Sequence, residues 1–96
     1  MSIAIVGAGF SGAVIAHELA NKGFKVDAYD TRPHVAGNCH TERDDKTKVM
    51  THVYGPNIFH TDNEKVWNYI QQFDEFMPFT NRAKAITNNR VYPIVA

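Results

Sequence analysis

Residues 3–13 read IAIVGAGFSGA, and this stretch decides the fold. An apolar run typical of a strand leads into Gly7-x-Gly9-x-x-Gly12, and a helical pattern follows directly. Strand, tight turn and helix in this order form the context in which such glycines bind a dinucleotide. The first glycine permits the turn, the second lets backbone N–H groups approach a pyrophosphate, and the third lets the helix pack close to the strand. The stretch therefore predicts an α/β, Rossmann-like βαβ unit whose helix N-terminus faces phosphates.

The residues that follow complete this unit and favour one cofactor. We expect a buried parallel strand over residues 1–6, a helix over 11–21 and a second parallel strand over 25–29. Asp30 lies about twenty positions after the glycines, where the fold places a carboxylate for a ribose hydroxyl. Pro33 and Gly37 then interrupt any further helix. Nicotinamide-only dehydrogenases usually continue into a crossover helix here, so the sequence favours FAD over NAD.

The rest of the chain adds antiparallel strands and one helix. Two short strands are expected over residues 39–42 and 48–52, followed by a polar loop. Residues 61–64 fit a capping box in front of a helix over 63–73. A hairpin is expected over 82–94, with two asparagines at positions 88 and 89 as its turn.

Two parallel strands and one crossover helix are too few to cover both faces of a sheet and to build a substrate pocket. We therefore expect residues 1–96 to be an incomplete N-terminal fragment of an FAD/NAD(P)-binding Rossmann-like domain. Residues 80–96 would begin a hairpin that leads to a substrate region outside this chain. Such a fragment, folded alone, would expose apolar surface and self-associate.

Composition excludes several classes of partner. The chain of 96 residues has a formal net charge of zero and no basic run, so nucleic-acid binding is not expected. Membrane insertion is not expected either, because no apolar run approaches the roughly 20 residues that span a bilayer. Cys39 is the single cysteine, and the N-terminus lacks the features of a secretory signal. Both observations fit a cytoplasmic protein, and no set of metal ligands is expected.

Four segments together resemble the bacterial UDP-galactopyranose mutase family. Beside the glycine loop these are RPHVAGN at 32–38, YGPNIFHT at 54–61, WNY at 67–69 and FTN at 79–81. The block Tyr-Gly-x-x-x-Phe-His-Thr is the most family-specific of them, whereas many flavoproteins share the glycine loop. The likeness runs from Met1 to about Pro93 and covers about the first quarter of such an enzyme.

The resemblance implies an FAD-dependent isomerase, an intramolecular transferase that interconverts UDP-galactopyranose and UDP-galactofuranose. In this family the flavin must be reduced, and its N5 atom acts as a covalent nucleophile. NADH or NADPH is the implied reductant, and the product supplies galactofuranose for cell wall polysaccharide. The resemblance also implies a homo-oligomer, while the 96-residue chain alone is expected to be inactive.

The family's binding positions transfer to this chain by alignment of the motifs. They are Gly7, Gly9, Phe10, Ser11 and Gly12 at the FAD pyrophosphate; Asp30 at the ribose; Thr31, Arg32, Gly37 and Asn38 near the cofactor; Asn57, Ile58 and His60 beside the flavin; and Asn81 near the substrate. No catalytic side chain is assigned with certainty, and His60 is the flavin-proximal candidate.

Two positions depart from the family pattern. Asn57 stands where the family usually has a histidine tied to the flavin's redox state, and asparagine does not titrate near neutral pH. Ala36 replaces the first glycine of the usual pair, so we expect an ordinary negative φ there.

Two other functions remain open from the sequence. An FAD-dependent oxidoreductase of the amine-oxidase type would share the logic of the first 38 residues. A nucleotide-binding fragment without catalytic activity is the second alternative, and Asn57 and the short length support it.

Overall fold

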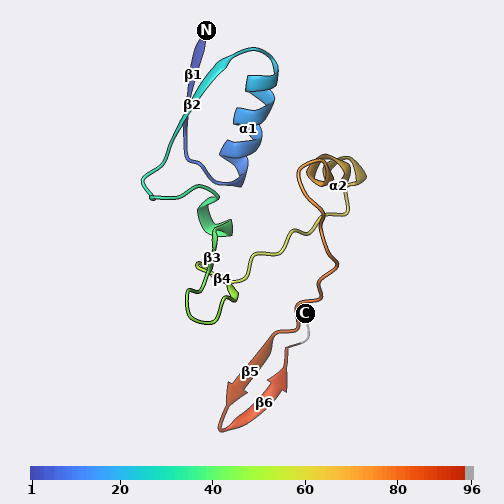
Figure 1. Cartoon of the computed structure of the whole chain (residues 1–96). Helices are drawn as coiled ribbons and strands as arrows, with labels where there is room; N and C mark the ends of the chain where they lie inside the picture. Colours follow the sequence, from blue (N-terminus) through green and yellow to red (C-terminus); the bar gives the residue numbers. More distant parts are fainter. Residues whose placement is uncertain (95–96) are drawn as a thin grey trace. The chain divides into compact units, whose positions relative to one another are not determined.

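The computed structural model describes residues 1–94. The chain divides into two compact units, Met1–Asn57 and Ile58–Ala96, which are described separately below (Figure 1). The first unit contains the glycine loop and the second contains the later helix and the hairpin.

The first unit begins with the predicted βαβ arrangement. Strands β1 (Ser2–Val6) and β2 (Lys25–Tyr29) pair in parallel, in a register that runs from Ser2 opposite Lys25 to Val6 opposite Tyr29. Helix α1 (Phe10–Asn21) connects them and contacts both strands (Figure 1). The helix begins at Phe10, one residue earlier than expected. The α/β, Rossmann-like class predicted from the sequence is confirmed.

Helix α1 is followed by a glycine that ends it. Gly23 has a φ of +89°, a conformation that residues with a Cβ rarely adopt. The N–H of Gly23 donates to the carbonyl of Ala20 (3.0 Å), and the N–H of Phe24 donates to that of Leu19 (3.2 Å). These two bonds satisfy carbonyls at the helix end, and the chain reverses directly into β2.

A small antiparallel pair follows in the same unit. The 3₁₀ helix η1 (Gly37–Cys39) precedes β3 (Thr41–Arg43), which pairs with β4 (Met50–His52). The first strand therefore starts two residues later than expected, because residues 37–39 curl into a turn. Asp44 closes the hairpin, accepting hydrogen bonds from the backbone N–H and the hydroxyl of Thr47 (2.7 and 2.8 Å). These bonds lower the pKa of Asp44.

The second unit contains α2 (Glu64–Gln71) and the hairpin of β5 (Lys84–Thr87) and β6 (Arg90–Pro93). Asn88 and Asn89 form the predicted two-residue turn, with φ of +49° and +59°. Positive φ at both central residues is the geometry that suits a tight hairpin.

The expected capping box at the start of α2 is wrong. The N-cap is Asn63, whose side chain accepts from the N–H groups of Lys65 and Val66 (2.9 and 3.2 Å). Thr61 instead accepts from the N–H of Asn63 (3.1 Å). The helix therefore begins later than a Thr61 cap would require, and it ends at Gln71 instead of residue 73.

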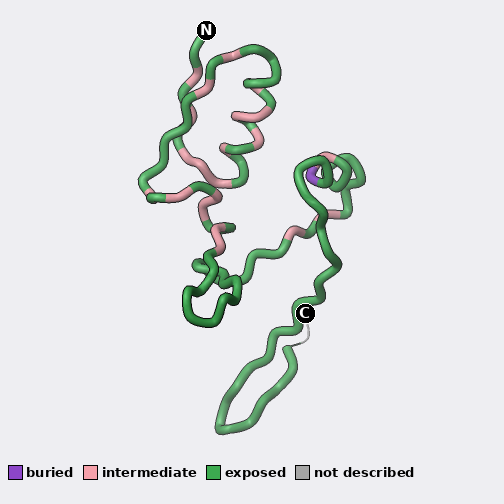
Figure 2. Tube along the Cα trace, in the orientation of Figure 1, coloured by how far each residue is buried: buried purple, intermediate pink, exposed green. Residues whose placement is uncertain are grey.

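Burial is sparse in both units. Ile70 in α2 is the single fully buried residue among those described, with 3% of its surface exposed (Figure 2). The expectation of a buried β1 is wrong for this chain, because Val6 is 91% exposed and Ile3 and Ile5 are only half-buried. One helix and one neighbouring strand do not enclose a strand that the sequence suits for burial on both faces. No helix within residues 1–94 is both long and apolar enough to cross a membrane.

Candidate cofactor-binding site

The carboxyl ends of β1 and β2 bring the glycine loop next to Asp30. The parallel register places Val6 opposite Tyr29, and the N–H of Gly7 extends the ladder by donating to the carbonyl of Tyr29 (2.6 Å). Ala8 and Asp30, which follow the ends of β1 and β2, are then close enough to form a hydrogen bond. The N–H of Ala8 donates to Oδ2 of Asp30 at 2.8 Å.

Asp30 is fixed at both carboxylate oxygens. Its Oδ1 accepts from the N–H of Arg32 at 2.8 Å, while Oδ2 holds the N–H of Ala8. These hydrogen bonds, that of Ala8 first, lower the pKa of Asp30 below its ordinary value of 3.8. Asp30 is thus ionised at neutral pH. Because each carboxylate oxygen offers about two acceptor sites, Asp30 retains capacity for ribose hydroxyls.

The start of α1 is open, unlike the start of α2. Gly9 is the N-cap of α1 and supplies no side-chain hydrogen bond, and no acidic residue lies in the first turn. Helix α2 is capped by Asn63 and has Glu64 in its first turn. A phosphate is attracted to a helix N-terminus, and an acidic side chain there would repel it. The α1 end therefore fits the linked phosphates of a dinucleotide.

The three glycines of the loop serve different purposes. Gly7 has a φ of +109°, which the tight turn requires. A Cβ on Gly12 would overlap the carbonyl oxygen of Gly7, so this glycine permits the close approach of helix and strand. A Cβ on Gly9 would meet only the Cα of Gly37 at 3.8 Å, an ordinary contact. The fold alone thus explains Gly7 and Gly12, whereas Gly9 leaves room beside the open helix end.

A second turn packs onto the glycine loop. The N–H of Ala36 donates to the carbonyl of Ala8 at 2.8 Å. A Cβ on Gly37 would lie only 3.0 Å from the Cα of Gly9, so the two loops touch through backbone atoms. The expectation for Ala36 is wrong, because its φ is +77°. The bond to Ala8 holds Ala36 in the left-handed conformation that glycine favours.

Asn38 and Asn57 connect this turn with the loop after β4. Nη1 of Arg32 donates to Oδ1 of Asn38 at 2.8 Å. Nδ2 of Asn57 donates to the carbonyls of Asn38 and Gly55, at 2.5 and 3.0 Å. The two amide hydrogens of Asn57 are thereby engaged with backbone carbonyls. Asn57 thus joins the loops, a function that the sequence alone does not show.

Other predicted positions lie at the edges of this arrangement or in the second unit. Thr31 is exposed directly after Asp30, and Phe10 and Ser11 open α1. Ile58, His60 and Asn81 belong to the second unit, where Ile58 is 42% exposed and the other two are also exposed. The structure thus brings together the candidates up to Asn57.

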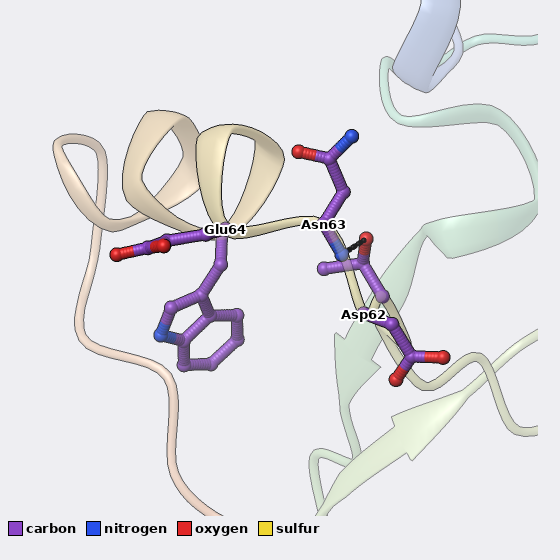
Figure 3. Close-up of a pocket in the computed structure, with 5 residues that line it drawn as sticks. Asp62, Asn63 and Glu64 are labelled. Atoms are coloured by element: carbon purple, nitrogen blue, oxygen red, sulfur yellow. Dashed lines mark hydrogen bonds between the residues drawn. The ribbon is translucent and has the colours of Figure 1, made fainter.

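The second unit has a shallow hollow of about 370 Å³ at the start of α2 (Figure 3). It is lined by Thr61, Asp62, Asn63, Glu64 and Trp67. Two carboxylates line it, and the side chain of Asn63 already caps the helix. This hollow is therefore unsuited to a phosphate, in contrast to the start of α1.

Sequence reasoning missed one cluster in the first unit. His34 stacks on His40, with ring centroids 3.8 Å apart and an interplanar angle of 8°. His34 also bonds the hydroxyl of Tyr54 at 2.7 Å, and the guanidinium of Arg32 lies 4.1 Å from the centre of the Tyr54 ring. Spacing along the chain gives no signal for the contacts of Tyr54, because β3, β4 and their turn separate it from Arg32 and His34.

Comparison with known families agrees with this geometry. Residues 5–73 match the family model described as an NAD(P)-binding Rossmann-like domain. The chain belongs to this Rossmann-like family. The match begins inside β1 and extends through α2, so it includes the glycine loop, Asp30 and Asn57.

Individual relatives of this Rossmann-like chain are sugar mutases by name. A "probable UDP-galactopyranose mutase" of Klebsiella pneumoniae is 56% identical over 97% of the chain and 24% of its own length. A dTDP-fucopyranose mutase of Escherichia coli is 50% identical over 96% of the chain and 24% of its own length. A UDP-galactopyranose mutase of Mycoplasma genitalium is 46% identical over 83% of the chain and 20% of its length. The chain thus resembles such mutases, as its motifs predict, and spans about a quarter of their length.

Proposed function

We propose that the protein carrying this chain is an FAD-dependent mutase that interconverts UDP-galactopyranose and UDP-galactofuranose. The observation that carries the proposal is the placement of the Asp30 carboxylate on the glycine loop, beside the open N-terminus of α1. This arrangement offers an acceptor for a ribose and a positive helix end for a pyrophosphate. The names of the relatives support the mutase reaction.

FAD is favoured over a nicotinamide cofactor by the segment after Asp30. Residues 31–36 form bends and residues 37–39 a 3₁₀ turn, where nicotinamide-only dehydrogenases usually have a helix. The turn packs against the glycine loop through the bond from Ala36 to Ala8. The absence of an α-helix over residues 31–39 supports FAD in this proposal.

When bound and reduced, FAD would supply a nucleophile, its N5 atom, for the anomeric carbon of the sugar. The chain's own residues would bind and orient it. The start of α1 would hold the pyrophosphate, Asp30 would accept from the ribose, and Gly37 and Asn38 would contact the cofactor. Asn57, Ile58 and His60 are the proposed flavin-side residues, and Asn81 the proposed substrate contact.

A second substrate deserves testing because of one relative. The Escherichia coli protein named dTDP-fucopyranose mutase is nearly as similar to this chain as the Klebsiella protein. Both names describe a mutase of a nucleotide-linked pyranose sugar. The nucleotide and the sugar are therefore to be determined by assay.

The experiment is to purify the natural protein and record its visible spectrum before and after dithionite reduction. We expect a flavin spectrum and turnover of UDP-galactofuranose by the reduced protein only. A colourless protein that takes up no added FAD overturns the cofactor and the mutase together. Flavin reduction by an amine, without mutase turnover, would indicate the oxidoreductase instead. Faster turnover of dTDP-fucofuranose would replace the sugar but keep the reaction.

Several finer properties belong to the same proposal and rest on the resemblance. They are reduction by NADH or NADPH, a homo-oligomeric state, a cytoplasmic location, use of the product in cell wall polysaccharide, and inactivity of residues 1–96 by themselves. Each needs its own measurement, beginning with reduction by NADH or NADPH and the oligomeric state of the natural protein.

A further inference from the structure

Tyr54 joins two segments of the first unit that are distant in sequence. Its hydroxyl lies 2.7 Å from Nε2 of His34, and its ring lies under the guanidinium of Arg32. Arg32 in turn donates to the side-chain oxygen of Asn38. The backbone carbonyl of Asn38 accepts from the side chain of Asn57. The contacts form a closed circuit from Tyr54 through Arg32 and Asn38 to Asn57, three residues after Tyr54.

The direction of the hydrogen bonds follows from the donors and acceptors available. Nδ1 of His34 lies 2.8 Å from the carbonyl oxygen of Val35, which can only accept. Nδ1 therefore carries the hydrogen. In the neutral ring Nε2 is then an acceptor, so the hydroxyl of Tyr54 donates to it. Tyr54 must keep its hydroxyl for this contact, since phenylalanine would leave Nε2 without its donor.

His40 packs against the face of the His34 ring. The two imidazoles are stacked, and Nε2 of His40 lies 2.9 Å from Oε1 of Glu42. The carboxylate accepts, so His40 carries its hydrogen at Nε2. His34 is thus held in orientation by a backbone carbonyl, a phenol and a stacked ring, although it is only half-buried. A surface histidine with no function in positioning would not need these three contacts.

We infer that Tyr54 and His34 are positioning residues that fix the loop of Asn57 against residues 32–38. The inference deepens the proposed function and rests on it, because Asn57 and Asn38 are the proposed cofactor neighbours. Tyr54 itself need not touch the cofactor. It sets the distance between two loops that would have to close over the same dinucleotide.

The first test is to measure the tautomer of His34 in the natural protein. This measurement needs no variant. In protein labelled with ¹⁵N-histidine, at a pH of about 8 where imidazoles are ordinarily neutral, ring-nitrogen NMR should show His34 protonated at Nδ1. His40 should show the opposite tautomer. His34 protonated at Nε2 would overturn the inference. This result does not depend on flavin, so it is separate from the fate of the proposed function.

The second test is the affinity for FAD. Tyr54→Phe should raise the dissociation constant about fivefold, the effect of one lost hydrogen bond, and should change the His34 tautomer signal. His34→Gln, which keeps an acceptor, should retain more affinity than His34→Leu. Tyr92→Phe is the matched control, because Tyr92 lies on the exposed strand β6. Unchanged affinity in Tyr54→Phe overturns the inference, whereas wild-type protein that binds no FAD overturns the proposed function.

Discussion

Ala36 adopts a backbone conformation that favours glycine, with a φ of +77°. A residue with a Cβ is strained there by about 1 kcal/mol or more, whereas glycine is not. Ala36→Gly should therefore leave the free energy of unfolding unchanged or raise it by up to about 1 kcal/mol. Urea denaturation of the natural protein measures this.

The control for Ala36 is the same substitution inside α1. Ala16→Gly should lower the free energy of unfolding by about 1 kcal/mol, because Ala16 has helical geometry. Equal destabilisation by the two substitutions would show that Ala36 is not held at positive φ in solution.

Asp30 predicts a pH dependence of stability. Its pKa is lowered by the N–H groups of Ala8 and Arg32, so folding favours the ionised form. The stabilising contribution is complete above the ordinary value of 3.8 and is lost as pH falls through the lower folded value. The difference in unfolding free energy between wild type and Asp30→Asn should be constant from about pH 7 to 5 and should shrink below about pH 4. A difference that already shrinks near pH 6 would contradict this.

At the scale of elements, substitutions in the glycine loop distinguish effects on folding from effects on cofactor binding. Gly12→Ala should lower the free energy of unfolding by about 2 kcal/mol, because its Cβ overlaps the carbonyl of Gly7 in the packed loop. Gly9→Ala should cost less than about 1 kcal/mol, because its Cβ meets only an ordinary contact. It should nevertheless reduce FAD affinity at least about tenfold, since the methyl group would occupy space for the pyrophosphate. Full FAD affinity in a folded Gly9→Ala protein would argue against a pyrophosphate at this loop.

Helix α2 offers a direct test of its cap. Asn63→Ala should lower the free energy of unfolding by about 1 kcal/mol, because two N–H groups lose their acceptor. Thr61→Ala removes a single bond outside the helix and should cost less. Urea denaturation of both variants distinguishes the two caps, and a larger effect of Thr61→Ala would restore the capping box that the sequence suggested.

The elements differ in how well the sequence predicts them. Glycines at 7, 12 and 23 mark positions where backbone geometry leaves few alternatives, so the strand, turn, helix and strand follow from local chemistry. The Asn88-Asn89 turn is equally local. Thr61 and Asn63 are both good caps, and only the path of the chain selects between them. Ala36 shows the opposite limit, because a bond to Ala8, far away in sequence, sets its conformation.

At the scale of the molecule, the main feature is the exposure of apolar side chains to solvent. No described residue of the first unit is fully buried, and Val6, Tyr29 and Val35 are each more than half exposed. We expect residues 1–96, expressed alone, to self-associate and to bind a hydrophobic dye. Light scattering over a concentration series measures the association. A compact monomer at high concentration, without dye binding, would contradict it.

The candidate site, like the elements, has parts that the sequence predicts and parts that it does not. Glycine loop and Asp30 were predictable, because the parallel register alone brings the ends of β1 and β2 together. The circuit of Arg32, Tyr54 and Asn57 was not, since it depends on how two irregular loops pack. Family resemblance marks Asn57 as unusual, but only the structure shows its two bonds to backbone carbonyls.

Within the described residues, β1 bonds to β2 along one side only. Its other side presents alternate N–H and C=O groups to the surroundings, ready to template an incoming extended segment. A segment that docks there correctly would also shield the chain from amyloid-like stacking.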